Sequence, residues 1–361
     1  MTIRPRRSLL NPNLKRPSAL ISNPRAISAQ WLDKNENFDP SLLALADDIL
    51  KSLKPSDIAS YPDLGHLYQK LAKWIGVTPD ALLLTPGSDG GIRLVFEAFV
   101  EHGDGVIYTN PTFAMYQVYC QMFGAEECQI DYQISDDGPY LNIEKILELI
   151  EKNKPKLFCL PNPDSPTGAV ILPEIAEQIL ETCEKFGTVF LMDEAYYPFY
   201  DETKVMRTQL SRNLIIARTF AKAWGAAGLR VGYLVAHPDT IDLVTKMRPM
   251  YEVGAISVEF MLRMLDHVDA MDKSVARINE GKKYFCNEMV KLGFKVLPSA
   301  GNFVHVAFAD KAALIANSLA GKVLYRESFE HPSLLGFSRF SIAPISEMKQ
   351  VVDLIKQSVN S

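Results

Sequence analysis

Short apolar runs that stop at polar residues recur through the middle of the chain. Val189–Met192 is followed directly by Asp193, and Thr219 lies two residues beyond Leu214–Ala217. Runs that are apolar at every position are typical of strands buried on both faces of a parallel sheet that helices cover. We therefore predict an α/β fold, in which a ligand binds outside the carboxyl ends of these strands, beside Asp193 and Thr219.

A third apolar run, Val231–Ala236, follows closely. Only eight residues separate it from Lys222, whereas a parallel crossover needs about a dozen or more. We therefore expect the strand that begins at Arg230 to run antiparallel, which brings Arg230 beside Lys222. The crevice then contains a carboxylate (Asp193), a hydroxyl (Thr219), an amine and a guanidinium. This set suits a small anionic ligand that carries a reactive carbonyl.

The rest of the chain divides into two patterns. Before residue 238, helices are predicted at 42–53, 67–75, 92–100, 114–123, 143–151 and 173–185, and further strands at 82–84, 106–109 and 157–160. Beyond it come a long helical region at 239–289 that Pro249 breaks, strands at 294–297, 303–307, 322–329 and 336–344, and helices at 311–320 and 348–358. Shorter strands followed by a return to helices predict a smaller α+β domain.

A glycine-rich turn, TPGSDGG at residues 85–91, lies between the strand at 82–84 and the helix at 92–100. A strand, such a turn and a helix in this order form an anion site, because backbone N–H groups and the helix dipole face the ligand. Ser88 or Asp89 could also be a plain helix N-cap. Taken with Lys222 and Arg230, the turn favours a phosphate group on the ligand.

Composition limits the classes of function. A chain of 361 residues with 47% apolar residues can bury a large core, and we expect two domains. The net charge of −5 and the pI of about 5.8 argue against a nucleic-acid partner. No apolar run reaches the roughly 18 residues of a membrane span, and the basic N-terminus lacks the apolar core of a secretory signal. Five scattered cysteines and six histidines show no metal-binding spacing, which predicts a cytoplasmic protein without a metal site.

Three motifs then carry a resemblance to a known family. DEAYY at 193–197, RTFAKAWGAAGLRVGY at 218–233 and NPDSPTG at 162–168 resemble the aspartate, lysine and asparagine motifs of fold-type I aminotransferases, which use pyridoxal phosphate. Over about residues 28–358, the chain is most similar to the histidinol-phosphate aminotransferase group. The resemblance implies a mostly parallel seven-stranded sheet flanked by helices, and a smaller α+β domain. The domains expected are a loose leader at 1–27, small-domain segments at 28–54 and 249–361, and a large cofactor-binding domain at 55–248.

The resemblance also implies roles for individual residues. Lys222 binds the cofactor aldehyde and carries the proton from the substrate Cα, since an amine near a cation and shielded from water has a lowered pKa. Asp193 pairs with the pyridine nitrogen and keeps the ring cationic, and Tyr196 contacts the ring hydroxyl. The other implied cofactor contacts are Ser88, Asp89, Thr219 and Arg230 at the phosphate, Phe113 on the ring face, and Asn162 or Ser165 near the ring hydroxyl.

Substrate residues are expected in two regions. Arg326 and Arg339, thirteen residues apart, match an arginine pair that holds the substrate's acidic group, and guanidinium groups bind carboxylate or phosphate bidentately. Tyr61 matches a tyrosine that reaches the neighbouring subunit's site, and Asn37, in the segment WLDKNEN, is a further candidate. The resemblance therefore implies a homodimer with shared active sites.

The chain departs from the family pattern in three motifs. Ser165, preceded by Asp164, stands where the family places an asparagine directly before PTG. Ala221 replaces the serine before the lysine and removes one phosphate ligand. Phe38, in NENFDP, stands in a segment where the family has a tyrosine that contacts the substrate phosphate. The missing tyrosine argues against histidinol phosphate as the substrate, while the expected fold and cofactor are little affected.

Three functions remain open at this point. The first is transamination between an amino acid or amino-phosphate compound and a 2-oxo acid, with glutamate and 2-oxoglutarate in one half-reaction. The second is decarboxylation of the threonine-phosphate decarboxylase type, which local motifs do not separate from the first. The third is a non-catalytic binding protein, against which the joint presence of Lys222, Asp193 and Arg230 argues. We expect transamination.

Overall fold

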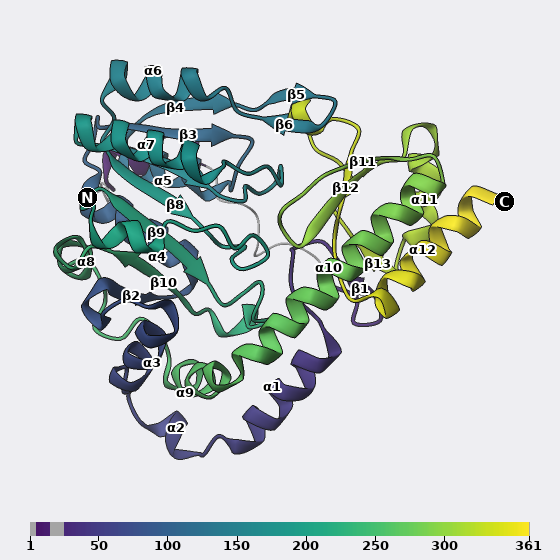
Figure 1. Cartoon of the computed structure of the whole chain (residues 1–361), viewed down its shortest axis with the longest axis horizontal. Helices are drawn as coiled ribbons and strands as arrows, with labels where there is room; N and C mark the ends of the chain where they lie inside the picture. Colours follow the sequence, from purple (N-terminus) through teal and green to yellow (C-terminus); the bar gives the residue numbers. More distant parts are fainter. Residues whose placement is uncertain (1–4, 15–24, 361) are drawn as a thin grey trace, which may run out of the picture.

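The computed structural model describes residues 5–14 and 25–360. Figure 1 shows a larger part built around one sheet and a smaller part, linked by the long helix α10 (Val268–Lys291). α10 has 24 residues, and it buries Met271, Val275, Ile278 and Phe285. No helix among the described residues is both long and apolar enough to cross a lipid bilayer.

The large sheet has seven strands. Their order across the sheet is β2 (Leu82–Thr85), β10 (Gly232–Ala236), β9 (Leu214–Thr219), β8 (Val189–Asp193), β7 (Leu157–Pro161), β3 (Gly105–Asn110) and β4 (Glu126–Asp131). Every pair is parallel except the two made by β10, which is antiparallel to both β2 and β9. The predicted α/β fold with a mostly parallel seven-stranded sheet is confirmed, as is the antiparallel return after Lys222.

The apolar runs form central strands because both of their faces are covered. All residues of β7, β8, β9 and β10 are buried. Along β8, Phe190 and Met192 join one core cluster, whereas Val189 and Leu191 join another. Alternate side chains therefore fill two cores on opposite faces of the sheet. The helices of this part are α1 (Pro40–Ser52), α2 (Ser56–Ala59), α3 (Gly65–Ile75), α4 (Gly87–Phe99), α5 (Met115–Phe123), α6 (Ile143–Asn153), α7 (Pro173–Phe186), α8 (Pro238–Thr245) and α9 (Ala255–Met264).

The smaller part has its own core. Its antiparallel sheet consists of β11 (Lys295–Leu297), β12 (Phe303–Ala307) and β14 (Ser338–Ser341), and its helices are α10, α11 (Ala312–Leu319) and α12 (Ile345–Asn360). Phe285, Phe340 and Ile355 belong to a cluster that also contains Leu32. The short strands β1 (Gln30–Trp31) and β13 (Val323–Leu324) pair in parallel. The segment around residue 30 therefore packs with the C-terminal part of the chain.

Several local elements differ from the sequence-based predictions. The short helix α2 was not predicted, and the strand predicted at 322–329 is only the two-residue β13. β4 and the hairpin of β5 (Gln133–Ser135) and β6 (Gly138–Tyr140) were not predicted. β4 buries only one of its six residues, because it lies at the sheet edge, so it lacks an apolar run.

Part of the expected leader lies against the large part. A 3-10 helix, Arg7–Leu10, precedes Leu14, which packs on the core around α5. The Ser8 hydroxyl donates a hydrogen bond to the carbonyl of Met122 (2.7 Å). Residues 1–4 and 15–24 lie outside the described residues, and the domain boundaries given above stay predictions.

Candidate active site

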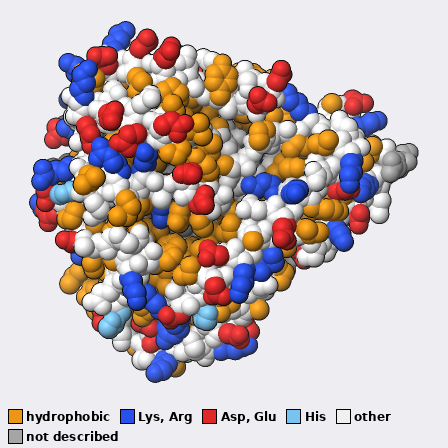
Figure 2. Space-filling model, in the orientation of Figure 1, with side chains coloured by type: hydrophobic (Ala, Val, Ile, Leu, Met, Phe, Trp, Pro, Cys, Tyr) orange, Lys and Arg blue, Asp and Glu red, His pale blue; other side chains and the backbone are white. Residues whose placement is uncertain are grey.

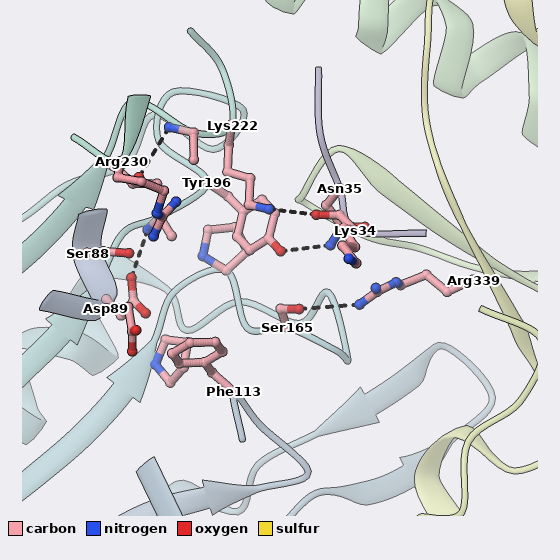
Figure 3. Close-up of a pocket in the computed structure, with 16 residues that line it drawn as sticks. Lys34, Asn35, Ser88, Asp89, Phe113, Ser165, Tyr196, Lys222, Arg230 and Arg339 are labelled. Atoms are coloured by element: carbon pink, nitrogen blue, oxygen red, sulfur yellow. Dashed lines mark hydrogen bonds between the residues drawn. The ribbon is translucent and has the colours of Figure 1, made fainter. Parts of the chain in front are cut away.

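A cavity of about 270 Å³ lies at the carboxyl ends of the central strands. Figure 3 shows side chains from both parts of the molecule around it. The predicted site residues that line it are Ser88, Asp89, Phe113, Ser165, Asp193, Tyr196, Thr219, Lys222, Arg230 and Arg339. Lys34 and Asn35, which we did not predict, line it as well. The strands therefore bring together side chains that are far apart in the sequence.

Lys222 extends into the middle of this cavity. Its Nζ donates a hydrogen bond to the carbonyl oxygen of Lys34 (2.8 Å). Burial, together with the positive charges of Arg339 and Arg230, lowers the pKa of Lys222 to about 8. A larger fraction of this amine is therefore neutral near physiological pH than of an ordinary lysine, which makes it a better nucleophile for an aldehyde.

Asp193 ends β8 and is buried. Its Oδ1 accepts the backbone N–H of Ala195 (3.0 Å), and its Oδ2 accepts the hydroxyl of Tyr116 (3.2 Å). Burial raises the pKa of Asp193 to about 7. A cationic ring nitrogen placed beside it would favour the carboxylate, since an opposite charge stabilises the ionised form. Tyr116, on α5, is a second neighbour that no sequence motif indicated.

The N-terminal segment contributes to the same cavity. The side-chain amide of Asn35 donates a hydrogen bond to the Tyr196 hydroxyl (2.8 Å), and its backbone N–H donates to Ser341 Oγ (2.8 Å). Burial raises the pKa of Tyr196, so its hydroxyl stays protonated at neutral pH. The motif NEN was the available signal, but from it we chose Asn37, not Asn35. Asn37 donates instead to the carbonyl of Ala223.

One end of the cavity is built to receive an anion. Ser88 lies in the first turn of α4, where backbone N–H groups are unpaired and the helix dipole is positive. A Cβ on Gly87 would lie 2.7 Å from Nη2 of Arg230, so the guanidinium rests directly against the turn. Arg230 adopts a left-handed backbone conformation (φ 54°), which is uncommon for a residue other than glycine. Thr219 adds a hydroxyl at the end of β9.

The opposite end of the cavity is formed by the smaller part. Arg339, on β14, is buried, and its Nη2 donates to the carbonyl of Asp33 (2.9 Å) while its Nη1 lies 3.4 Å from Ser165 Oγ. Arg326 pairs with Arg339 through two backbone hydrogen bonds. The Arg326 guanidinium, however, lies over the ring of Phe329 (4.2 Å) and does not line the cavity.

Four predicted site residues lie outside the cavity: Asn37, Tyr61, Asn162 and Arg326. The side-chain amide of Asn162 donates to the carbonyl of Ile171 (3.1 Å) and accepts the backbone N–H of the same residue (2.9 Å). The carboxylate of Asp164 accepts hydrogen bonds from Thr112 and Thr167. Of Asn162, Asp164 and Ser165, it is therefore Ser165 that lies at the cavity.

A buried ion pair supports the strand ends. Arg218 donates through Nε and Nη2 to Glu194 (2.9 and 2.7 Å), and the two side chains are 4% and 2% exposed. The Arg218 guanidinium also lies 3.5 Å from the ring centroid of Tyr197. Glu194 and Arg218 directly neighbour Asp193 and Thr219 in the sequence. The pair therefore fixes β8 and β9 relative to each other at the edge of the cavity.

Comparison with known proteins identifies the family. Residues 30–355 match the family described as aminotransferase class I and II. The chain belongs to this family. Histidinol-phosphate aminotransferase from Thermoanaerobacter sp. (strain X514) is 33% identical over 320 residues, which are 87% of this chain and 89% of that protein. The aminotransferase is thus similar to this relative over nearly its whole length.

Solved structures agree with the assignment. Histidinol-phosphate aminotransferase from Sinorhizobium meliloti, in complex with pyridoxal-5'-phosphate, superposes with a TM-score of 0.79 at 25% identity, covering 92% of this aminotransferase and 91% of that chain. L-threonine-O-3-phosphate decarboxylase from Porphyromonas gingivalis gives a TM-score of 0.76 at 21% identity, covering 92% and 100%. The second likeness shows the fold alone.

The cofactor of this aminotransferase is pyridoxal phosphate. The residues of the cavity fit it, since they offer an amine for its aldehyde, a buried acid for its ring nitrogen and an anion site for its phosphate (Figure 3). Gly87 and Gly232 leave no room for a Cβ beside that anion site, which keeps its backbone close-packed. When bound, the cofactor supplies an electron sink for the charge that develops at the substrate Cα.

Proposed function

We propose that this aminotransferase moves an amino group between an amino acid or amino-phosphate compound and a 2-oxo acid, with glutamate and 2-oxoglutarate as one pair. The observation that carries the proposal is the position of Lys222 between an anion site at Arg230 and a second cation, Arg339, in one cavity. The relatives named histidinol-phosphate aminotransferases support transamination. The segment after NEN, which contains Phe38 and no tyrosine, argues against histidinol phosphate as the donor.

Lys222 has two tasks in the proposed reaction. Its amine would hold the cofactor through the cofactor aldehyde. Once the substrate amine has displaced it, the free Nζ would accept the proton from the substrate Cα and act as the acid that gives this proton back. The lowered pKa of about 8 supports this role, because a general base is most effective when its pKa is near the working pH.

Asp193 and Tyr196 tune the cofactor ring in this proposal. Asp193 ion-pairs with the ring nitrogen and keeps it protonated, and the Tyr116 hydroxyl holds the carboxylate in place. Tyr196 donates to the ring hydroxyl oxygen and is itself oriented by Asn35. Phe113, which is 36% exposed, covers one face of the ring.

The two ends of the cavity bind the two anionic groups. Ser88, Asp89, Thr219 and Arg230 hold the cofactor phosphate, chiefly through the backbone N–H groups of the α4 turn and the guanidinium. Arg339 binds the substrate carboxylate, because a guanidinium fork matches a carboxylate bidentately. Its hydrogen bonds to Asp33 and Ser165 support this assignment by fixing the fork.

We also propose a cytoplasmic homodimer with shared active sites. Tyr61 is 79% exposed and stacks on Tyr251, and Ile58 and Met250, at 75% and 79% exposed, lie near them in the sequence. Figure 2 shows hydrophobic side chains gathered over the larger part on the face in view. Exposed apolar side chains in such number support association with a second copy.

The test is a half-reaction with purified enzyme. Glutamate should convert the cofactor to its aminated form, seen as a change in its visible absorbance, and 2-oxoglutarate should appear in equal amount. A screen of amino donors against 2-oxoglutarate then identifies the second substrate. Lys222→Ala should lose both the absorbance change and turnover. Release of carbon dioxide from an amino-phosphate acid, with no 2-oxo acid formed, would replace the proposal by the decarboxylase alternative.

A further inference from the structure

Positive charge exceeds negative charge around the cavity. The basic residues that line it are Lys34, Lys222, Arg230 and Arg339, and the acidic residues are Asp89 and Asp193. In the proposed function, Lys222, Arg230 and Asp193 bind the cofactor. Lys34 and Arg339 then remain at the far end, opposite Ser88 and Asp89, as Figure 3 shows.

The acids near Lys34 in the sequence form ion pairs with another residue. Arg25 forms ion pairs with Asp33 (2.9 Å) and Glu36 (2.7 Å), and all three side chains are only 17–23% exposed. The Arg25 guanidinium also lies 4.7 Å from the ring centroid of Trp31. Asp33 and Glu36 are thus both paired with Arg25, and neither forms an ion pair with Lys34.

The backbone around Lys34 is fixed by the active site itself. The carbonyl of Asp33 accepts from Arg339, the carbonyl of Lys34 accepts from Lys222, and the amide of Asn35 donates to Tyr196. Three successive residues therefore each contact a different group of the site. The Lys34 side chain starts from a defined point between Lys222 and Arg339. It is exposed, and within residues 5–14 and 25–360 it has no ion-pair partner.

We propose that Lys34 is a specificity-determining residue that, with Arg339, selects substrates carrying two acidic groups. The proposal rests on the proposed function and deepens it. The buried, planar fork of Arg339 suits the α-carboxylate, whereas the long, flexible stem of Lys34 brings a compact charge to a second carboxylate or a phosphate on the substrate side chain. A substrate with one acidic group leaves Lys34 without a partner and gains nothing from it.

Steady-state kinetics test this with a matched set of variants. Lys34→Met should raise the KM for 2-oxoglutarate about tenfold, as expected for the loss of one charge-assisted hydrogen bond, and leave kcat within about twofold. The KM for 2-oxobutyrate, which has one acidic group, should not change. Lys34→Arg, which keeps the positive charge, should bring the KM for 2-oxoglutarate most of the way back to the wild-type value. Lys349→Met, which removes an exposed charge on α12, should behave as wild type.

Ligand binding provides a second readout that does not require turnover. Calorimetric titration of the holoenzyme with succinate and with 3-phosphonopropionate compares a dicarboxylate with a carboxylate that carries a phosphorus acid. Weaker binding of either compound to Lys34→Met supports the proposal, and the more strongly affected compound identifies the second acid. Equal affinities for wild type and Lys34→Met, or no binding of either dianion to wild type, would overturn it.

Failure of this proposal can be told apart from failure of the proposed function. A wild-type enzyme that aminates its cofactor with glutamate but shows equal KM values in wild type and Lys34→Met retains the transaminase function and loses the role of Lys34. An enzyme with no glutamate half-reaction loses the proposed function. In that case the dianion titrations still decide whether Lys34 binds a second acid.

Discussion

The Nζ of Lys222 lies 2.8 Å from the carbonyl oxygen of Lys34, a residue 188 positions earlier in the chain. Lys222 follows β9 of the large sheet, whereas Lys34 follows β1, which pairs with β13 of the smaller part. The hydrogen bond therefore joins the two parts of the molecule at the reactive amine. Because neither part contains all the groups of the cavity, the site is complete only when both are packed together.

The charge of Arg339 is expected to set the basicity of Lys222. Burial and Arg339 are the two largest causes of the lowered pKa of about 8, so Arg339→Gln should raise this pKa towards its ordinary value of 10.5. The amine would then be protonated over a wider pH range and react more slowly at pH 8. The measurement is the pH dependence of lysine acylation in cofactor-free protein, followed residue by residue with mass spectrometry.

Lys282 is an internal control for that experiment. Burial also lowers its pKa to about 8, and no arginine contributes to the shift. Its Nζ donates to the carbonyl of Ser299. Arg339→Gln should therefore leave the pH dependence of acylation at Lys282 unchanged. An unchanged profile at Lys222 as well would show that Arg339 does not act on the amine.

Asp193 should make the stability of the cofactor-free protein depend on pH. Its pKa is about 7 in the folded state against an ordinary 3.8, so between these values the folded state binds the proton and the unfolded state does not. The free energy of unfolding should therefore fall as the pH rises from 4 to 7, by up to about 4 kcal/mol at about 1.4 kcal/mol per pKa unit.

The variant Asp193→Asn isolates this contribution. Asparagine does not titrate, so the stability difference between wild type and variant, measured by urea unfolding at several pH values, should change in favour of the variant as the pH rises. With cofactor bound, Asp193→Ala should retain some cofactor yet lose most turnover, because the ring charge is no longer held. A stability difference that is constant with pH would mean that Asp193 is ionised throughout.

Gly232 is expected to be essential for the anion site. A Cβ at this position would lie 2.4 Å from the carbonyl carbon of Gly87 and 2.5 Å from the nitrogen of Ser88. Gly232→Ala must therefore push the turn away from β10, which should destabilise the protein by about 1–3 kcal/mol and weaken cofactor binding. Gly228→Ala is the control, since no atom lies within 4 Å of its Cβ position. Equal cofactor affinity in the two variants would contradict the close packing of the turn.

The buried pair of Arg218 and Glu194 should matter far more for stability than an exposed pair. Arg218→Met leaves the Glu194 carboxylate buried without its partner, and such changes cost about 3–5 kcal/mol. The comparison is Arg212→Met, which breaks the pair with Asp239 whose side chains are 71% and 59% exposed, for a cost below about 1 kcal/mol. Chemical denaturation measures both, and similar losses in the two variants would contradict the prediction.

The sheet and the strand-end residues could be predicted because their signal is local. Asp193 and Thr219 end fully apolar runs, and the short connection to β10 decides its direction by length alone. Motif resemblance added the roles of Lys222 and Arg230. None of these inferences needed the tertiary structure, since strand ends in a parallel sheet meet at one edge.

The residues that were missed depend on long-range packing. Lys34 and Asn35 reach the cavity because β1 pairs with β13, nearly 300 positions later in the chain. Tyr116 reaches Asp193 from the first turn of α5. Asn162 was predicted to contact the cofactor, but its side-chain amide instead makes local hydrogen bonds with the backbone of Ile171. No periodicity or spacing distinguishes these cases from ordinary core or surface positions.

The proposed sharing of active sites between two subunits can be tested by complementation. Tyr61 stacks on Tyr251 at 4.5 Å and yet is 79% exposed, so it is free to contact a second copy. If Tyr61 of one subunit serves the Lys222 of the other, Tyr61→Ala and Lys222→Ala should each have low activity alone. A mixed dimer would contain one site with both residues intact.

Refolding the two variants together should then restore up to about a quarter of wild-type activity, since half of the dimers are mixed and each has one intact site of two. Tyr140→Ala, which truncates another exposed tyrosine, should be fully active and serve as the control for surface truncation. If Tyr61 acts within its own subunit, no combination contains an intact site and the mixture stays inactive. Sedimentation velocity on each variant checks that dimers form, because a monomeric Tyr61→Ala protein would place this residue in the interface and not in the partner's site.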